Sequence, residues 1–183
     1  MISLPFRRPR QAPKIDALYG MIVAQARAPA FYAGYGVPDT VAGRLDMILL
    51  HLVLVLRQLQ REHGAGAIPP AGQQLFDRFC QDIDDNFREM GVGDLTVPKE
   101  MQRVAAAFYG RAKAYGFALD DGNSAALEAA VGRNVFGVNA APLGARRLAT
   151  YMRETSRRLE GQTAGALARG EFEFPEPETV ASP

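Results

Sequence analysis

The stretch MILLHLVLVL, residues 47–56, is the longest apolar run of the chain, and it decides the fold. Only His51 interrupts it. At about 1.5 Å per residue, a helix of this length would cover only about half of a bilayer core, so a buried helix is expected instead of a membrane span. Asp39 or Thr40 can cap its first turn, and glycines follow His63. We therefore predict a long, apolar, central helix over about residues 39–63.

Glycine and proline divide the rest of the chain into segments with helical periodicity, and no internal repeat or strand-like alternation is present. The predicted helices span about residues 14–28, 39–63, 72–90, 96–115, 123–135 and 142–160. We therefore expect an all-α fold, with a single domain of about six helices over residues 14–170. Residues 1–13 are expected to be a flexible basic arm. The acidic, proline-rich residues 171–183 are expected to be a disordered tail.

The composition is that of an ordinary globular protein of 183 residues with a net charge of +1. With so little net charge, no global field draws the chain to DNA, and a charged partner must be met by a local patch. The single cysteine, Cys80, excludes an internal disulfide, and its place on the apolar face of segment 72–90 favours a core role. The first residues lack the apolar region of a secretory signal, so a cytoplasmic location is expected.

The sequence predicts no metal, cofactor or small-molecule substrate. Its one cysteine and two histidines form no zinc-binding spacing, and no glycine-rich phosphate loop follows a strand. The main enzyme alternative comes from Asp82, Asp84, Asp85 and Glu89, because helical isoprenoid synthases hold magnesium and pyrophosphate through aspartate-rich helices. However, these residues lie largely opposite the apolar face, and no second aspartate-rich helix is predicted. A solvent-facing acidic surface is the favoured interpretation.

Two features are candidates for binding a partner through charge or apolar area. Arg153 and Arg157, four residues apart in a basic segment, could contact RNA, a ribosome or anionic lipid, or they could form an ordinary exposed helix face with Glu154.

The central helix is the second feature, because it is apolar on nearly every side of its middle. Such a helix is either enclosed by others or exposes an apolar patch. The loop before it carries Tyr32 and Tyr35, a residue type favoured at interfaces. We hypothesise that Tyr32, Tyr35, Leu50, His51 and Leu54 line a surface for a partner protein. The alternative is that the tyrosines fold back to cover the core.

An ordered series of segments resembles the ubiquinol–cytochrome c reductase assembly chaperone family. The chain looks like a bacterial member of this family. The segments are FYAGYGVPDT at 31–40, RLDMILLHLVL at 44–54, FREMGVGD at 87–94, FYGR at 108–111 and AALEAAVGRNVF at 125–136. Together they extend the similarity over about residues 15–170.

The resemblance implies an all-helical, non-enzymatic chaperone for the cytochrome bc1 complex. Its expected partner is newly made cytochrome b or another bc1 subunit, and the ribosome or the cytoplasmic face of the inner membrane is a further expected contact. The resemblance implies no catalytic residues. The open alternatives are the isoprenoid enzyme and a general helical module that binds RNA or protein.

Overall fold

The computed structural model describes residues 12–63, 69–137 and 143–180, and in these ranges the chain forms nine helices and no strand. The six long helices are α1 (Ala12–Ala26), α3 (Val41–His63), α4 (Pro70–Glu89), α5 (Val97–Asp120), α6 (Ser124–Val135) and α7 (Leu143–Glu160). The three short ones are α2 (Pro29–Ala33), α8 (Ala164–Ala168) and α9 (Pro177–Val180). The predicted all-α fold is confirmed. Residues 1–11 of the predicted basic arm lie outside the described residues.

Local capping explains where several helices begin. The Thr40 hydroxyl accepts a 3.1 Å hydrogen bond from the amide of Gly43, as predicted for the start of α3. The side chain of Asn123 accepts a 3.0 Å bond from Ala126 in the first turn of α6. Proline in the first turn of α4 and α5 costs no helical hydrogen bond there. These residues favour helix starts close to the predicted positions.

Helix α3 lies at the centre of the molecule. It packs against α1, α4, α5, α6, α7 and α8. Every side chain from Met47 to Leu56 is less than a tenth exposed. Burying a large aliphatic side chain contributes about 1.5–3 kcal/mol, so this helix supplies much of the apolar free energy of folding. Among the described helices, none has both the length and the apolar character needed to cross a lipid bilayer.

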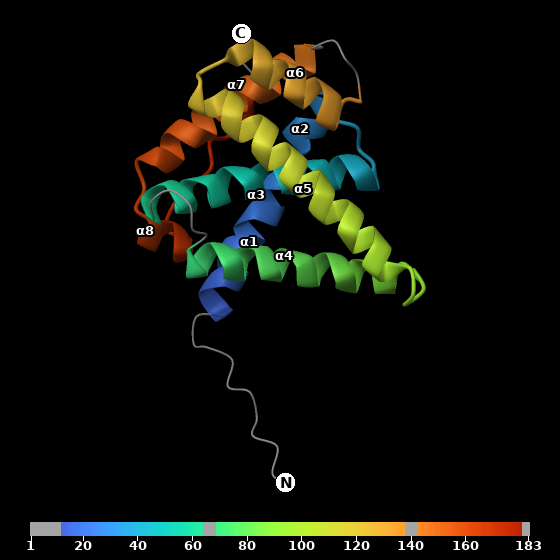
Figure 1. Cartoon of the computed structure of the whole chain (residues 1–183). Helices are drawn as coiled ribbons and strands as arrows, with labels where there is room; N and C mark the ends of the chain where they lie inside the picture. Colours follow the sequence, from blue (N-terminus) through green and yellow to red (C-terminus); the bar gives the residue numbers. More distant parts are fainter. Residues whose placement is uncertain (1–11, 64–68, 138–142, 181–183) are drawn as a thin grey trace.

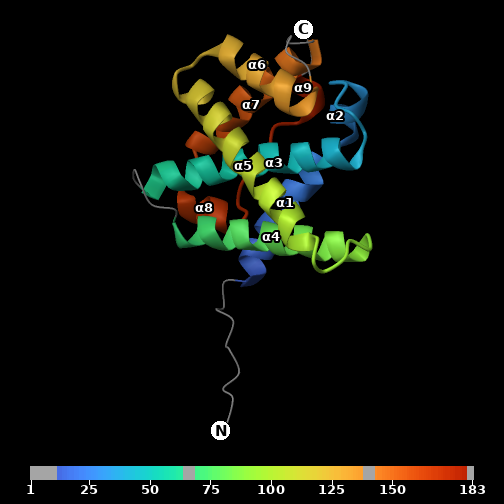
Figure 2. The same ribbon diagram turned by 45° about the vertical axis from the view of Figure 1, so that its right-hand side comes forward.

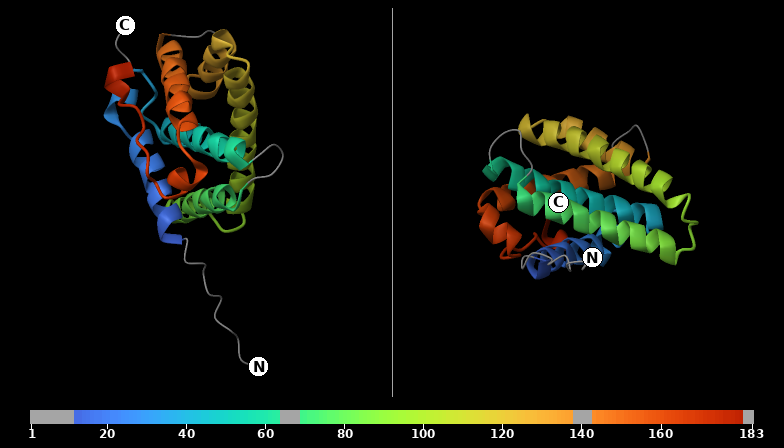
Figure 3. Two further views of the ribbon diagram at one scale, coloured as in Figure 1. Left: turned by 90° about the vertical axis from the view of Figure 1, so that its left-hand side faces the viewer. Right: turned by 60° about the horizontal axis from the view of Figure 1, so that its bottom comes forward.

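The helices around α3 form layers. Helices α3 and α4 run side by side, and α5 crosses both on one face (Figures 1 and 2). Helix α1 packs against the same pair on the opposite face, as the view from below shows (Figure 3, right). Helices α6 and α7 pack together at one end of this arrangement. A surface hollow between α3, α4 and α5 therefore lies on the face opposite α1.

The segment after Gly170 corrects the expectation of a disordered tail, at least as far as Val180. It runs back along α1 and ends in α9 beside α2 and α7 (Figure 3, left). Phe172 is only 8% exposed, and Phe174 packs against the core. The physical reason is that two phenylalanines in this acidic stretch find a preformed apolar surface, which offsets the entropy of ordering it. Residues 181–183 lie outside the described part.

Candidate partner-binding site

His51 is the polar centre of the buried core. Its Nδ1 lies 2.8 Å from the carbonyl oxygen of Met47, and its Nε2 lies 2.9 Å from the hydroxyl of Tyr151. Because a carbonyl can only accept, Nδ1 carries the proton, and Nε2 accepts from Tyr151. Burial lowers the pKa of His51 to about 4, so the ring is neutral at pH 7. Both ring nitrogens are satisfied, which is the arrangement of a structural histidine.

Aromatic rings surround this histidine. Phe31 lies 4.9 Å from Tyr151 and 5.3 Å from Tyr35, measured between ring centroids, and it meets the His51 ring edge-on at 5.5 Å. Such edge-to-face pairs add about 0.5–1.5 kcal/mol beyond the area they bury. We call Phe31, Tyr35, His51 and Tyr151 the aromatic cluster. It joins α2, the following loop and α3 to α7, whose Tyr151 lies 100 residues after His51.

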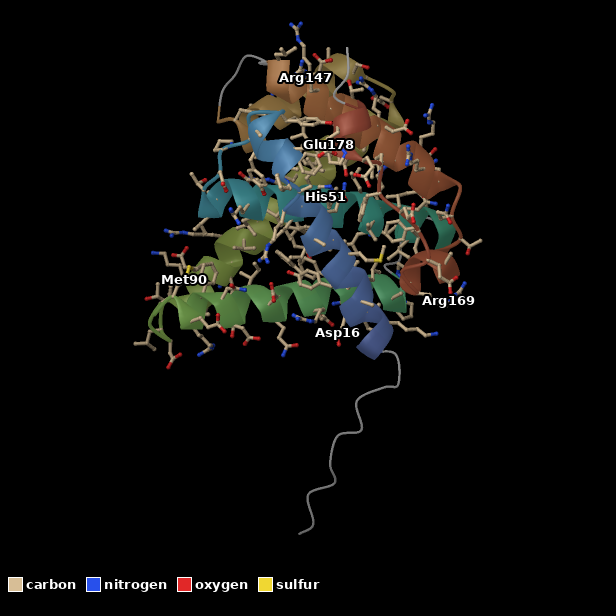
Figure 4. The ribbon with its side chains drawn as sticks, turned by 180° about the vertical axis from the view of Figure 1, so that it is seen from behind. Asp16, His51, Met90, Arg147, Arg169 and Glu178 are labelled. Atoms are coloured by element: carbon tan, nitrogen blue, oxygen red, sulfur yellow. The ribbon has the colours of Figure 1, made fainter. Side chains whose placement is uncertain are left out.

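The C-terminal segment, residues 171–180, covers the aromatic cluster. Phe174 meets the His51 ring edge-on at 5.3 Å. The Tyr35 hydroxyl donates to the Pro177 carbonyl, and Gln25 Nε2 donates to the Pro175 carbonyl at 3.1 Å. Figure 4 shows His51 in the middle of the molecule, with Glu178 of the C-terminal segment above it. The cluster is therefore closed off from solvent by the chain's own end.

The structure corrects the exposure expected of four predicted site residues. Leu50 and His51 are fully buried, and Tyr35 and Leu54 are 2% exposed. Leu50 and Leu54 are enclosed because helices pack on all sides of α3. His51 and Tyr35 are buried because the C-terminal segment covers them. Of the two interpretations of the central helix, enclosure by other helices is the one observed. A partner can reach His51 and Tyr35 only if the C-terminal segment moves.

Tyr32 differs from these four because it remains partly exposed. Its hydroxyl donates a 2.7 Å hydrogen bond to the carbonyl of Ala26, and the Arg44 guanidinium lies 5.6 Å from the ring centroid. Burial raises the pKa of Tyr32, so the hydroxyl stays a donor at neutral pH. Tyr32 is therefore partly accessible to solvent and lies beside a cation.

The predicted basic residues of α7 lie at different depths. Arg157 is exposed and pairs with Glu154, which also pairs with Arg158 at 2.9 Å. Arg153 is partly buried. Its Nη2 donates to Thr150 at 3.0 Å, whereas its Nη1 has no hydrogen-bond partner among the described residues. Intrahelical pairing thus neutralises part of the charge of α7, and one buried donor of Arg153 is left over.

The acidic side of α4 forms a shallow polar hollow together with α1. Asp82 accepts a 2.9 Å hydrogen bond from Tyr19 and lies 3.7 Å from Arg78. Asp84 pairs with Arg88 at 2.7 Å. Asp85 and Glu89 share the rim with Arg27. Among the residues that the structure describes, no three His, Cys, Asp or Glu side chains are placed to hold a metal ion. On the other side of the hollow, α1 contributes Tyr19, Arg27 and a single acidic residue, Asp16, which pairs with Arg78.

A second surface hollow is a groove between α3, α4 and α5 with a mostly apolar lining. It encloses about 400 Å³, and Val53, Leu56, Phe76 and Phe108 form its apolar lining. Tyr109 and Phe117 line it although they are 59% and 65% exposed. Large exposed aromatics beside an apolar hollow are typical of a surface that binds another molecule. We call this hollow the α3–α4–α5 groove.

Sequence reasoning missed the α3–α4–α5 groove. The periodicity of α5 assigns Phe108, Ala112 and Tyr115 to its buried side, and this stripe is observed. Tyr109 and Phe117 fall outside the stripe but are eight residues apart, so they share a second face of the helix. Two aromatic residues outside the buried stripe of α5 were the signal in the sequence that could have revealed this groove.

These features define an all-helical protein with an apolar surface groove and a partly neutralised basic helix, which is a class suited to binding another polypeptide. The chain matches the Ubiquinol-cytochrome C chaperone family over residues 33–174, and it belongs to that family. The crystal structure of the Cbp3 homolog from Brucella abortus is similar to it, with 36% sequence identity, a TM-score of 0.80 and 93% of each chain covered. No curated protein matches the chain significantly.

Proposed function

We propose that this protein is a non-enzymatic chaperone that binds newly made cytochrome b, or another bc1 subunit, while ubiquinol–cytochrome c reductase is assembled. The observation that carries the proposal is the family match over residues 33–174. The similarity of the whole fold to a Cbp3 homolog supports it. A chaperone needs surface that is apolar and accessible, and the exposed aromatics of the α3–α4–α5 groove meet that need.

Of the predicted partner contacts, Tyr32, Arg153 and Arg157 have exposed atoms in the folded chain. Arg157 is suited to an anionic surface, because its side chain is 77% exposed. We assign α7 to the contact with the ribosome or with the cytoplasmic face of the inner membrane, where phosphate groups supply negative charge.

Deleting the gene in the native host tests the proposal. Assembled bc1 complex, measured on native gels, and cytochrome b, measured by its haem spectrum, should both fall, and the wild-type gene should restore them. Normal levels of both in the deletion strain would exclude the proposed function. Binding of magnesium and pyrophosphate by the purified protein would favour the isoprenoid enzyme instead, and strongly salt-dependent RNA binding would favour a nucleic-acid module.

A further inference from the structure

The α3–α4–α5 groove has more room than the folded chain uses. Gly116 lines the groove, and a Cβ built on it meets no described atom within 4 Å apart from its chain neighbours and the nearby backbone of its own helix. Glycine in the middle of a helix is destabilising relative to alanine. The unfolded chain is more flexible at a glycine, so it loses more conformational entropy when the helix forms. The packing described here gives no reason for that cost. The missing side chain keeps this part of the groove open.

The walls of the groove restrict the kind of occupant. All three walls are helices, and their backbone groups are already bonded within each helix. An extended peptide would bring unpaired amides and carbonyls into an apolar hollow that offers them no backbone partner. A helix satisfies its own backbone and presents only side chains. An occupant that is itself a helix therefore fits this surface, as in other helix-in-groove complexes.

Charge at the rim adds a second requirement. Lys113 is exposed at the groove, and Arg57 lies in its wall with a buried Nε that has no hydrogen-bond partner among the described residues. The acidic residue of the lining, Asp120, is already paired with Arg57. Arg57 also pairs with Glu160, so the surplus positive charge of the rim is that of Lys113, which complements a carboxylate on the occupant.

We infer that the α3–α4–α5 groove binds one amphipathic or apolar helix of a client protein, with large aliphatic side chains against Phe76 and Phe117 and an acidic residue beside Lys113. This inference rests on the proposed function and names the part of the client that is held. A second copy of the chain fits less well, because a two-fold interface would place the cations of one groove against those of the other.

Peptide binding tests the inference with the full-length protein. The probe is a fluorescent helical peptide of about 18 residues with a leucine face and one glutamate at its edge. Its affinity is measured by anisotropy and compared with that of the same peptide carrying glutamine. Gly116→Leu fills the groove and should weaken binding about tenfold or more, while the chain keeps its helix content and melting temperature. Lys113→Glu should reverse the preference, so that the glutamine peptide binds better.

Gly110→Leu is the matched control, because Gly110 lies on the same helix and has the same open space around its Cβ but does not line the groove. This variant should bind within about twofold of wild type. Equal affinity of wild type and Gly116→Leu would overturn the inference. A concentration-dependent dimer that Gly116→Leu abolishes would also overturn it and make the groove an interface between copies.

A complementation experiment separates this inference from the proposed function. If deletion lowers bc1 complex and Gly116→Leu fails to restore it, both stand. If deletion lowers bc1 complex but Gly116→Leu restores it fully, the groove is not the client site and the inference fails alone. If deletion leaves bc1 complex unchanged, the proposed function fails, and peptide binding still decides whether the groove holds a helix.

Discussion

The hydroxyl of Tyr35 donates a 2.7 Å hydrogen bond to the backbone carbonyl of Pro177, 142 residues further along the chain. The bond is buried, and burial raises the pKa of Tyr35 to about 12, so the hydroxyl remains a donor at neutral pH. It joins the loop before α3 to the start of α9. The C-terminal segment is therefore part of the folded core. Removing this one hydrogen bond measures part of the segment's contribution to stability.

Tyr35→Phe should lower the free energy of unfolding by about 1–3 kcal/mol, because the Pro177 carbonyl loses its partner in a buried place. Urea unfolding followed by circular dichroism measures the change. Tyr109→Phe, on the exposed face of α5, is the control and should change stability by less than about 0.5 kcal/mol. In a chain that ends at Gly170, Tyr35→Phe should be nearly neutral, because the acceptor is gone. An equal loss in both backgrounds would show that the bond is not the cause.

Acid should destabilise the protein through His51. The unfolded chain takes up a proton near the ordinary pKa of 6.5, whereas the folded chain does so only near 4. The stability that this histidine contributes is complete above pH 6.5 and is lost as the pH falls toward 4. Between pH 7.5 and 4.5 the loss should be roughly 2–3 kcal/mol. Urea unfolding at both values, for wild type and His51→Gln, measures it.

Only the difference between wild type and His51→Gln isolates this effect, since Asp46 titrates with the opposite sign. Burial raises the pKa of Asp46 to about 6, so its contribution to stability grows as the pH falls through that value. If His51→Gln shows the same acid sensitivity as wild type, the neutral buried histidine is not responsible for it.

Gly144 should tolerate no side chain. A Cβ there would lie 2.0 Å from the carbonyl oxygen of Tyr35 and 3.0 Å from the Phe136 ring. Gly144→Ala must therefore push α7 away from the loop that carries Tyr35, at a cost of about 1–3 kcal/mol. Gly110→Ala, in open space on α5, should instead stabilise the fold by about 0.5–1 kcal/mol. Thermal unfolding of both variants tests the contrast, and a stabilising Gly144→Ala would contradict the observed packing.

The ion pair of Asp46 and Arg111 should behave as a unit. Arg111 Nη2 lies 2.5 Å from Asp46 and 3.0 Å from the carbonyl of Asn134, so it joins α3, α5 and the end of α6. Arg111→Met leaves the carboxylate partly buried without its cation and should cost about 3 kcal/mol at pH 7. The double variant Asp46→Leu/Arg111→Met should recover most of that loss in chemical unfolding. A double variant as unstable as the single one would mean that packing, not charge, is responsible.

Local patterns in the sequence were sufficient to predict the six long helices, but not the short helices α2, α8 and α9. Thr40 and Asn123 cap α3 and α6 through atoms only three residues away, and the apolar run 47–56 identifies the central helix. The candidate site was less predictable. Leu50 and Leu54 have the same apolar character whether a helix of this chain or a client covers them, so periodicity alone left both interpretations open.

The sequence by itself determined an all-helical chain built around residues 47–56, because helix formation and burial follow from residue types at short spacing. Only the tertiary structure decided that Phe172 and Phe174 complete the core, that His51 is buried neutral, and that Tyr109 and Phe117 stay exposed beside a groove. These outcomes depend on pairs such as Phe174 and His51, which lie far apart in the chain. Their contact free energy exists only after the helices have packed, so no local pattern records it.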